Sequence, residues 1–185
     1  MHGPVLVNWL LAVLTAAAGG YCLSRLRRAP GIAGTGTHRR HSHESDAAEA
    51  LMGLGMAAMA VSGDAVPAVV WAWVFGVPAA VFLLAALLGP DRRAHRLHHA
   101  IGGLAMTYAA LAMAAAPAAG HHHAGAGGTP LLTGVLLLYF GGYSLWAGTR
   151  LLGTTTGRLA AATAGLPRAC RLSMGIGMFA MLLTM

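Results

Sequence analysis

The stretch from Val66 to Leu88, VPAVVWAWVFGVPAAVFLLAALL, contains no charged side chain. A helix needs roughly 20 consecutive apolar residues to cross the hydrocarbon core of a bilayer, and this run is long enough. A Ser-Gly-Asp turn at residues 62–64 precedes it, and Arg92 and Arg93 follow it. The stretch therefore predicts a transmembrane helix, and it sets the class of the whole chain.

Five further apolar runs lie on either side of this one. The chain of 185 residues is 57% hydrophobic and 9% charged, whereas soluble domains carry roughly 25% charged residues. We therefore expect an all-α, polytopic transmembrane bundle of about six helices in a single domain over residues 1–185. The five further spans are predicted at Val5–Leu23, Ala47–Val61, His99–Pro117, Leu131–Leu152 and Arg171–Met185.

The basic residues predict the orientation of this bundle. All twelve are Arg, and all fall in three alternate connections or at the helix ends beside them. Because positive loops stay in the cytoplasm, we expect a plasma (inner) membrane protein with cytoplasmic Arg-rich loops and both termini outside. The arginines lie between apolar spans rather than along one folded face, which is where a nucleic-acid-binding surface would need them. We therefore expect a lipid bilayer as partner and no nucleic acid. Residues 29–46 are predicted to form a mobile cytoplasmic loop, and residues 120–129 a flexible outer loop.

An internal repeat relates the first and last pairs of spans. At an offset of 122 residues, Tyr and three Met residues recur without a gap: Tyr21, Met52, Met56 and Met59 fall on Tyr143, Met174, Met178 and Met181. An offset of 50 residues brings Gly53 and Met56 onto Gly103 and Met106. Such pseudo-symmetry is common in membrane folds. It predicts three hairpins about a pseudo-threefold axis, with the even spans innermost.

Methionines on these even spans predict a Cu(I) site. Residues at i, i+3, i+4 and i+7 share one face of a helix, so each even span presents a sulfur-bearing stripe. Three thioethers at one depth form a soft pocket that suits Cu(I). We predict Met56, Met106 and Met178 as core ligands. Further ligands along the path would be Met52, Met59, Met174 and Met181, with Glu49, His95 and His99 at a cytoplasmic entrance.

Other residues are secondary candidates. Glu49 and Arg171 would form an ion pair or a gate, because ionisable groups inside a membrane are rare and usually paired. Neither cysteine belongs to a CxxC pair, and a disulfide is not expected on the reducing cytoplasmic side. The secondary metal candidates are His98, Cys170, His121, His122 and His123.

Two other functions stay open at this point. Methionine is also a flexible filler of helix interfaces, so the chain could be a non-catalytic assembly subunit without metal. The spacing His95-x-x-His98-His99 occurs in di-iron membrane enzymes, and a histidine with a methionine could hold haem iron. No phosphate loop or catalytic triad spacing is present, which favours copper handling, for example transfer to a membrane partner such as an oxidase, over enzymatic activity.

Four segments carry a resemblance to a known family. They are HGPVLVNWLLAVL (residues 2–14), EALMGLGMAAMAV (49–61), HHAIGGLAM (98–106) and CRLSMGIGMFAML (170–182). Together they resemble a family of actinobacterial integral membrane proteins that is defined only as a domain of unknown function. The resemblance extends over essentially the whole chain. It implies a membrane location and carries no activity or site residue.

Overall fold

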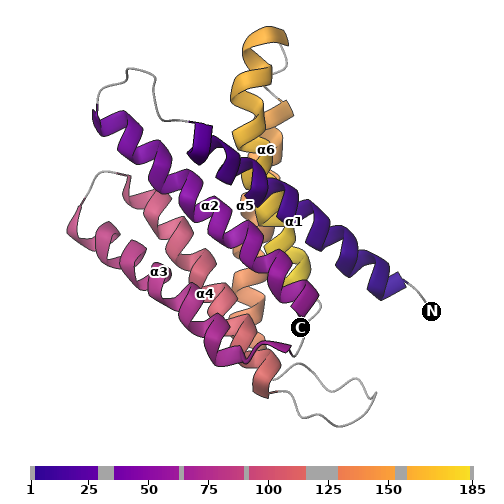
Figure 1. Cartoon of the computed structure of the whole chain (residues 1–185). Helices are drawn as coiled ribbons and strands as arrows, with labels where there is room; N and C mark the ends of the chain where they lie inside the picture. The colour runs from indigo at the N-terminus through magenta and orange to yellow at the C-terminus, as the bar shows by residue number, and fades with distance from the viewer. Residues whose placement is uncertain are drawn as a thin grey trace. The chain divides into compact units, whose positions relative to one another are not determined.

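Six helices and no strand make up the described part of the chain. The computed structural model describes residues 3–28, 36–62, 65–89, 92–115, 129–152 and 158–183. Its side chains are described for residues 9–28, 43–62, 65–89, 92–115, 129–150 and 169–183. The all-α prediction is confirmed. The helices are α1 (Gly3–Arg28), α2 (Gly36–Ser62), α3 (Ala68–Leu88), α4 (Arg93–Ala115), α5 (Pro130–Leu152) and α6 (Arg158–Leu183), as Figure 1 shows.

The predicted helix ends agree best where a helix is apolar throughout. The span predicted at Val66–Leu88 corresponds to α3, which is observed at Ala68–Leu88. The span predicted at Leu131–Leu152 corresponds to α5, which is observed at Pro130–Leu152. Two helices begin more than ten residues earlier than predicted, and α4 also begins earlier, at Arg93 instead of His99. Helix α2 starts at Gly36 instead of Ala47, so residues 36–46 of the predicted cytoplasmic loop are helical, and α6 starts at Arg158 instead of Arg171. The predicted outer loop at residues 120–129 lies outside the described residues except for Thr129.

The chain divides into two compact units. The first unit comprises Met1–Val61 and Phe140–Gly177, and therefore contains α1, α2 and most of α6. The second unit comprises Ser62–Tyr139 and Met178–Met185, and contains α3 and α4.

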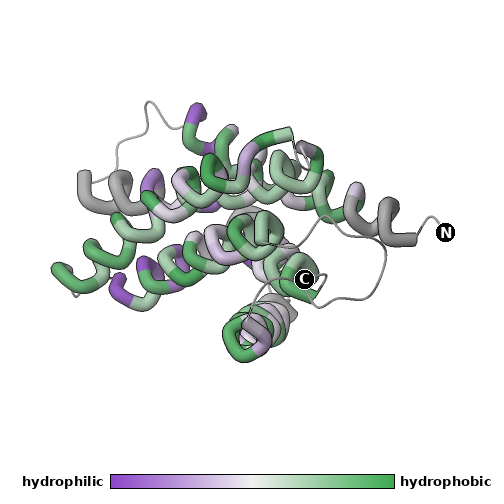
Figure 2. The backbone as a smooth tube through the Cα atoms, turned by 90° about the horizontal axis from the view of Figure 1, so that it is seen from below, coloured by the Kyte–Doolittle hydropathy of each residue, from purple (hydrophilic) through white to green (hydrophobic). Residues whose placement is uncertain are grey.

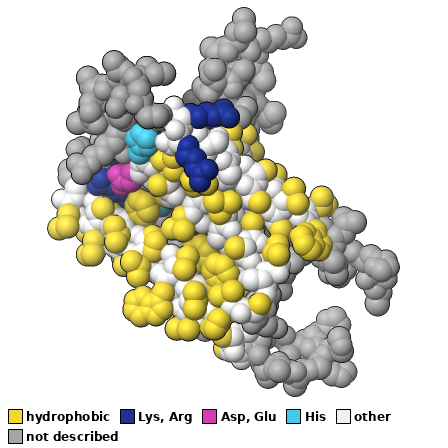
Figure 3. Space-filling model, viewed as in Figure 1, with side chains coloured by type: hydrophobic (Ala, Val, Ile, Leu, Met, Phe, Trp, Pro, Cys, Tyr) yellow, Lys and Arg dark blue, Asp and Glu magenta, His cyan; other side chains and the backbone are white. Residues whose placement is uncertain are grey.

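Within the described residues, three helical segments are long and apolar enough to cross a membrane. They are Trp9–Arg28, Ala68–Leu88 and Pro130–Arg150. Ala169–Leu183 is apolar but shorter. Hydrophobic positions predominate along the helices in Figure 2, and hydrophobic side chains cover most of the described surface seen in Figure 3. Leu138 on α5 is 80% exposed and Trp73 on α3 is 68% exposed, which is the arrangement that lipid contact favours.

A glycine lies at a close interhelical contact in each consecutive helix pair. A Cβ atom at Gly53 of α2 would lie 2.8 Å from the Thr15 carbonyl oxygen of α1, and one at Gly103 of α4 would lie 2.8 Å from the Ala79 Cβ of α3. In the third pair, a Cβ at Gly175 of α6 would lie 2.7 Å from Ser144 Oγ of α5. Small residues allow this close approach, which stabilises helix pairs in lipid. The three glycines occupy equivalent positions at the offsets of 50 and 122 residues, so the repeat reappears in the packing.

Candidate metal centre

A buried ion pair joins α2 and α6 in the first unit. The Glu49 side chain is 2% exposed, and Arg171 Nε donates a hydrogen bond to its Oε1 atom over 2.6 Å. Ser45, one turn before Glu49, accepts a hydrogen bond from Arg171 Nη2 at 3.1 Å and donates one to Glu49 Oε1 at 3.2 Å. The sequence predicted that Glu49 and Arg171 would form an ion pair or a gate, and the structure brings these two side chains together as an ion pair.

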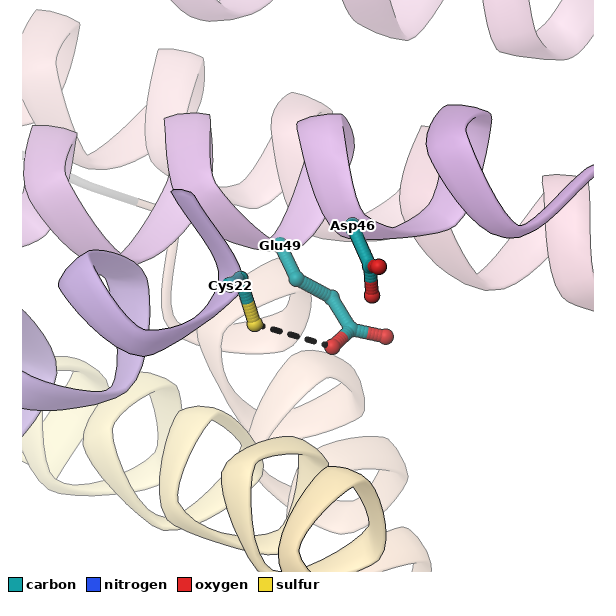
Figure 4. A group of neighbouring side chains, drawn as sticks. All are labelled: Cys22, Asp46 and Glu49. Atoms are coloured by element: carbon teal, nitrogen blue, oxygen red, sulfur yellow. Dashed lines mark hydrogen bonds between the residues drawn. The ribbon is translucent and has the colours of Figure 1, made fainter. Parts of the chain in front are cut away.

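A thiol and two carboxylates gather beside this pair. Cys22 of α1 donates a hydrogen bond to Glu49 Oε2 at 3.5 Å, and Asp46 lies one turn before Glu49 on α2. One ligand atom from each of Cys22, Asp46 and Glu49 lies within 4.8 Å of the other two. Figure 4 shows the thiol of Cys22 pointing toward the carboxylate of Glu49 across the α1–α2 contact. All three residues are buried.

A second thiol lies next to the first. Cys170 of α6 belongs to the same buried cluster as Cys22, together with Ala18 and Ala50. Both cysteines are buried and free rather than joined in a disulfide. The site therefore offers two sulfur atoms from different helices, next to a carboxylate that already has a guanidinium partner.

The second carboxylate of the site has its own cation. Asp46 Oδ1 lies 3.4 Å from Arg25 Nη1, and the Asp46 side chain is 12% exposed. Burial raises the pKa of Asp46 above its usual range, and the attraction of Arg25 only partly opposes this shift. The carboxyl group is therefore harder to ionise in the folded protein than in the unfolded chain.

This shift predicts a shallow pH dependence of stability. Because the folded state holds the Asp46 proton more tightly, the free energy of unfolding should fall as the pH rises above 3.8, the usual Asp value, until the folded carboxyl has ionised. Asp46→Asn should remove this part of the slope, since the amide does not titrate. Thermal unfolding in detergent between pH 3.5 and 7 measures it. An unchanged slope in Asp46→Asn would contradict the assignment.

Buried methionines continue the sulfur-bearing face of α2 and α6. Met56 is 5% exposed, Met59 is 6% exposed, and Met174 on α6 is also buried. Met56 Sδ lies 3.9 Å from the position of a Cβ atom at Gly177, so the Met56 sulfur lies against α6. Met52 is half-buried. In the first unit, α2 and α6 therefore contact each other at two levels. Glu49 pairs with Arg171 at one level, and Met56 lies against Gly177 at the other.

The remaining predicted ligands lie in the second unit or outside the described residues. Met106 is fully buried, Met178 is buried and Met181 is half-buried. Met56 belongs to the first unit whereas Met106 and Met178 belong to the second, so the predicted three-sulfur layer stays a prediction. His95, His98 and His99 form a separate group on α4 in the second unit. The outer-loop candidates His121, His122 and His123 lie outside the described residues.

Sequence reasoning missed Cys22 and Asp46 as members of the site. A signal for Cys22 was present, because Cys22 ends one predicted span and Cys170 precedes another on the same predicted face of the membrane. The contact of Asp46 with the site follows from the early start of α2. A helix beginning at Gly36 puts Asp46 one turn before Glu49 and on the same side.

Comparisons with known proteins give one result. A search of curated proteins and a search of solved structures each found no match. A family model described as a domain of unknown function (DUF5134) matches residues 41–185. The match includes Glu49, Cys170 and Arg171 and begins after Cys22. Because it extends over more than half of the sequence, the chain belongs to the family of the DUF5134 domain of unknown function.

Proposed function

We propose that this chain is an integral membrane protein that binds Cu(I) in its first unit and takes part in copper handling. The observation that supports this most directly is that Cys22 and Cys170, from different helices, belong to one buried cluster. Buried thioethers lie farther along the same helices, at Met56 and Met174. Thiolates and thioethers are soft donors, and soft donors select Cu(I) among the biologically abundant metal ions.

The charges around the site favour a soft ion over a hard one. Glu49 and Asp46 are already paired with Arg171 and Arg25. An ion such as Mg²⁺ or Ca²⁺ prefers oxygen ligands and would compete with both arginines for the two carboxylates. A thiol exchanges its proton for Cu(I), since metal ligands bind in deprotonated form. The carboxylate of Glu49, which accepts the Cys22 hydrogen bond, gives that proton an acceptor.

The orientation of the chain belongs to the same proposal. If the Arg-rich connections lie in the cytoplasm, the two thiols lie at the cytoplasmic end of a multi-pass protein. Copper in the reducing cytoplasm is in the Cu(I) state. Met56 and Met59 then lead from that end toward the opposite face. In the absence of a nucleotide-binding motif we infer storage or transfer, for example to a membrane partner such as an oxidase, rather than primary active transport.

Cu(I) retention by the full chain in detergent tests the proposal. The protein is loaded with Cu(I) under anaerobic reducing conditions and titrated with a chromophoric Cu(I) chelator. We expect one tightly held ion per chain. Cys22→Ser and Cys170→Ser should each weaken retention by at least ~100-fold, because loss of a direct ligand costs more than the 10–100-fold typical of its outer partners. Serine keeps the size and the hydrogen bonding of the thiol.

Two controls accompany these variants. Met56→Leu should weaken retention less than the serine variants, and Met113→Leu should leave it unchanged, because Met113 lies in the second unit and is 49% exposed. Equal retention in all variants would refute the site. Purified protein without copper affinity would instead favour a packing or assembly subunit, and stoichiometric iron or a haem absorption band would favour a redox enzyme.

A further inference from the structure

Two histidines on one helix of the second unit bring one ring nitrogen each close together. His95 and His99 of α4 are separated by one helical turn, and their Nε2 atoms lie 3.2 Å apart. The two rings meet edge to face, with centroids 4.5 Å apart and an angle of 85° between their planes. His99 is buried at 5% exposure and His95 is half-buried, so the pair is open to the molecular surface on the side of His95.

The separation of these nitrogens matches the bite of a tetrahedral metal ion. Zn²⁺ binds imidazole nitrogen at about 2.0–2.1 Å. Two ligands at that length and at a tetrahedral angle lie about 3.3–3.4 Å apart, by the same bond lengths. The observed 3.2 Å differs from this value by only about 0.1–0.2 Å. We propose that His95 and His99 form a bidentate site for a divalent transition metal ion of the Zn²⁺ class.

The surroundings of His99 hold its ring in place. The Phe82 ring of α3 lies 5.4 Å from the His99 ring, measured between centroids. The next histidine is directed elsewhere, because His98 Nδ1 forms a hydrogen bond with the Tyr139 hydroxyl at 2.9 Å. A fixed ring loses little rotamer freedom when a metal binds, which favours affinity.

The nearest cation on α4 is directed to another partner. Arg96 Nη1 donates a hydrogen bond to the Ala85 carbonyl oxygen at the end of α3, over 3.0 Å. Its guanidinium therefore adds a second hydrogen bond to a carbonyl near the C-terminus of α3, which also accepts one from the Gly89 N–H at 3.2 Å. The spacing of His95 and His99, four residues apart on one helix face, is the one that places two zinc ligands together in helical metal sites.

This site differs from the proposed copper site in position and in chemistry. It lies in the second unit and offers imidazole nitrogens, which suit Zn²⁺ and similar divalent ions, whereas thiols and thioethers suit Cu(I). The inference does not rest on the copper proposal. One probe ion separates the two sites: thiolate ligation of Co²⁺ adds an intense near-ultraviolet charge-transfer band, whereas imidazole ligation gives only visible bands.

Co²⁺ titration of the full chain in detergent tests the histidine site. The starting protein carries His121, His122 and His123→Gln, so that this His-rich segment does not contribute. We expect one Co²⁺ per chain with visible absorption and displacement by Zn²⁺. His95→Gln and His99→Gln should each weaken this binding at least tenfold, because an amide can keep the hydrogen bond between the two side chains but is a poor metal ligand.

The matched control is His98→Gln on the same turn of α4, which should bind Co²⁺ as the starting protein does. Cys22→Ser should also leave the visible bands unchanged. If His95→Gln and His99→Gln keep full Co²⁺ affinity while eluting as monodisperse protein, the two histidines are only a hydrogen-bonded pair and the proposal fails. The proposal also fails if the starting protein binds no Co²⁺, or if all of its Co²⁺ absorption depends on Cys22.

Discussion

Replacing Arg171 with methionine should destabilise the protein by about 3 kcal/mol, since removing one partner of a buried ion pair leaves an uncompensated charge behind. The Glu49 carboxylate is 2% exposed, and both its oxygen atoms accept hydrogen bonds from neighbouring side chains. Arg171 itself is 40% exposed at the side chain. The guanidinium end of the pair is therefore only partly buried, which places the expected cost at the lower end of the usual 3–5 kcal/mol.

The double variant Glu49→Gln/Arg171→Met separates the charge from the packing. A neutral amide of the same shape removes the buried charge, so the double variant should recover most of the stability that Arg171→Met loses. Reversible unfolding in mixed detergent micelles, followed by circular dichroism, measures both. If the double variant is as unstable as Arg171→Met alone, the loss comes from the arginine side chain and not from the ion pair.

The same pair shows what the sequence could predict about the site. The offset of 122 residues that aligns Tyr21 with Tyr143 also aligns Glu49 with Arg171, and the structure places these two residues in contact. The repeat could not predict Cys22 in the same way, because its equivalent is Ser144. A thiol contributed by an odd-numbered helix breaks the symmetry, and only coordinates reveal which of two equivalent positions holds it.

The fold was predictable where hydropathy and helix coincide. Helix α3 is apolar from end to end, so its composition marks both of its limits. The first turns of α2 are polar and Arg-bearing, and hydropathy detects only the apolar part of such a helix. The first turns of α6 are followed by Pro167 and Arg168, and a proline in a helical pattern usually indicates a helix boundary. Arg and Glu are good helix formers, so the helix can continue through residues that contain no apolar signal. This is why Gly36 and Arg158 were missed as helix starts.

The histidine pair illustrates a similar limit. Its spacing of four residues predicts that His95 and His99 share a helix face. Their ring orientations depend on the Phe82 ring and on the hydrogen bond between His98 and Tyr139. These contacts come from other helices, so the 3.2 Å separation of the nitrogens could not be derived from spacing alone.

Gly53→Ala should destabilise the α1–α2 pair, although alanine is the better helix former. The new Cβ would lie 2.8 Å from the Thr15 carbonyl oxygen and 3.0 Å from the backbone of Gly19. These are backbone atoms of the facing helix, so no side chain can rotate away and the two helices must separate. Overpacking of this kind costs roughly 1–3 kcal/mol. Detergent unfolding, as for Arg171→Met, measures the change.

Gly20→Ala provides the control within the same helix pair. No atom lies within 4 Å of the added Cβ at Gly20, so alanine should stabilise α1 by up to about 1 kcal/mol through helix propensity alone. The two glycines differ in what faces them and not in residue type. Equal effects at Gly53 and Gly20 would contradict the close packing of α1 on α2.

The Gly53 substitution also tests whether helix packing positions the metal site. Cys22 on α1 and Glu49 on α2 lie one turn beyond this close contact, and their 3.5 Å hydrogen bond crosses between the same two helices. Separating the helices should therefore pull the thiol away from the carboxylate and weaken Cu(I) retention. Gly20→Ala should keep that retention, because it leaves the interhelical distance unchanged. A Gly53→Ala variant that loses stability but retains Cu(I) as tightly as the original protein would place the copper ligands elsewhere.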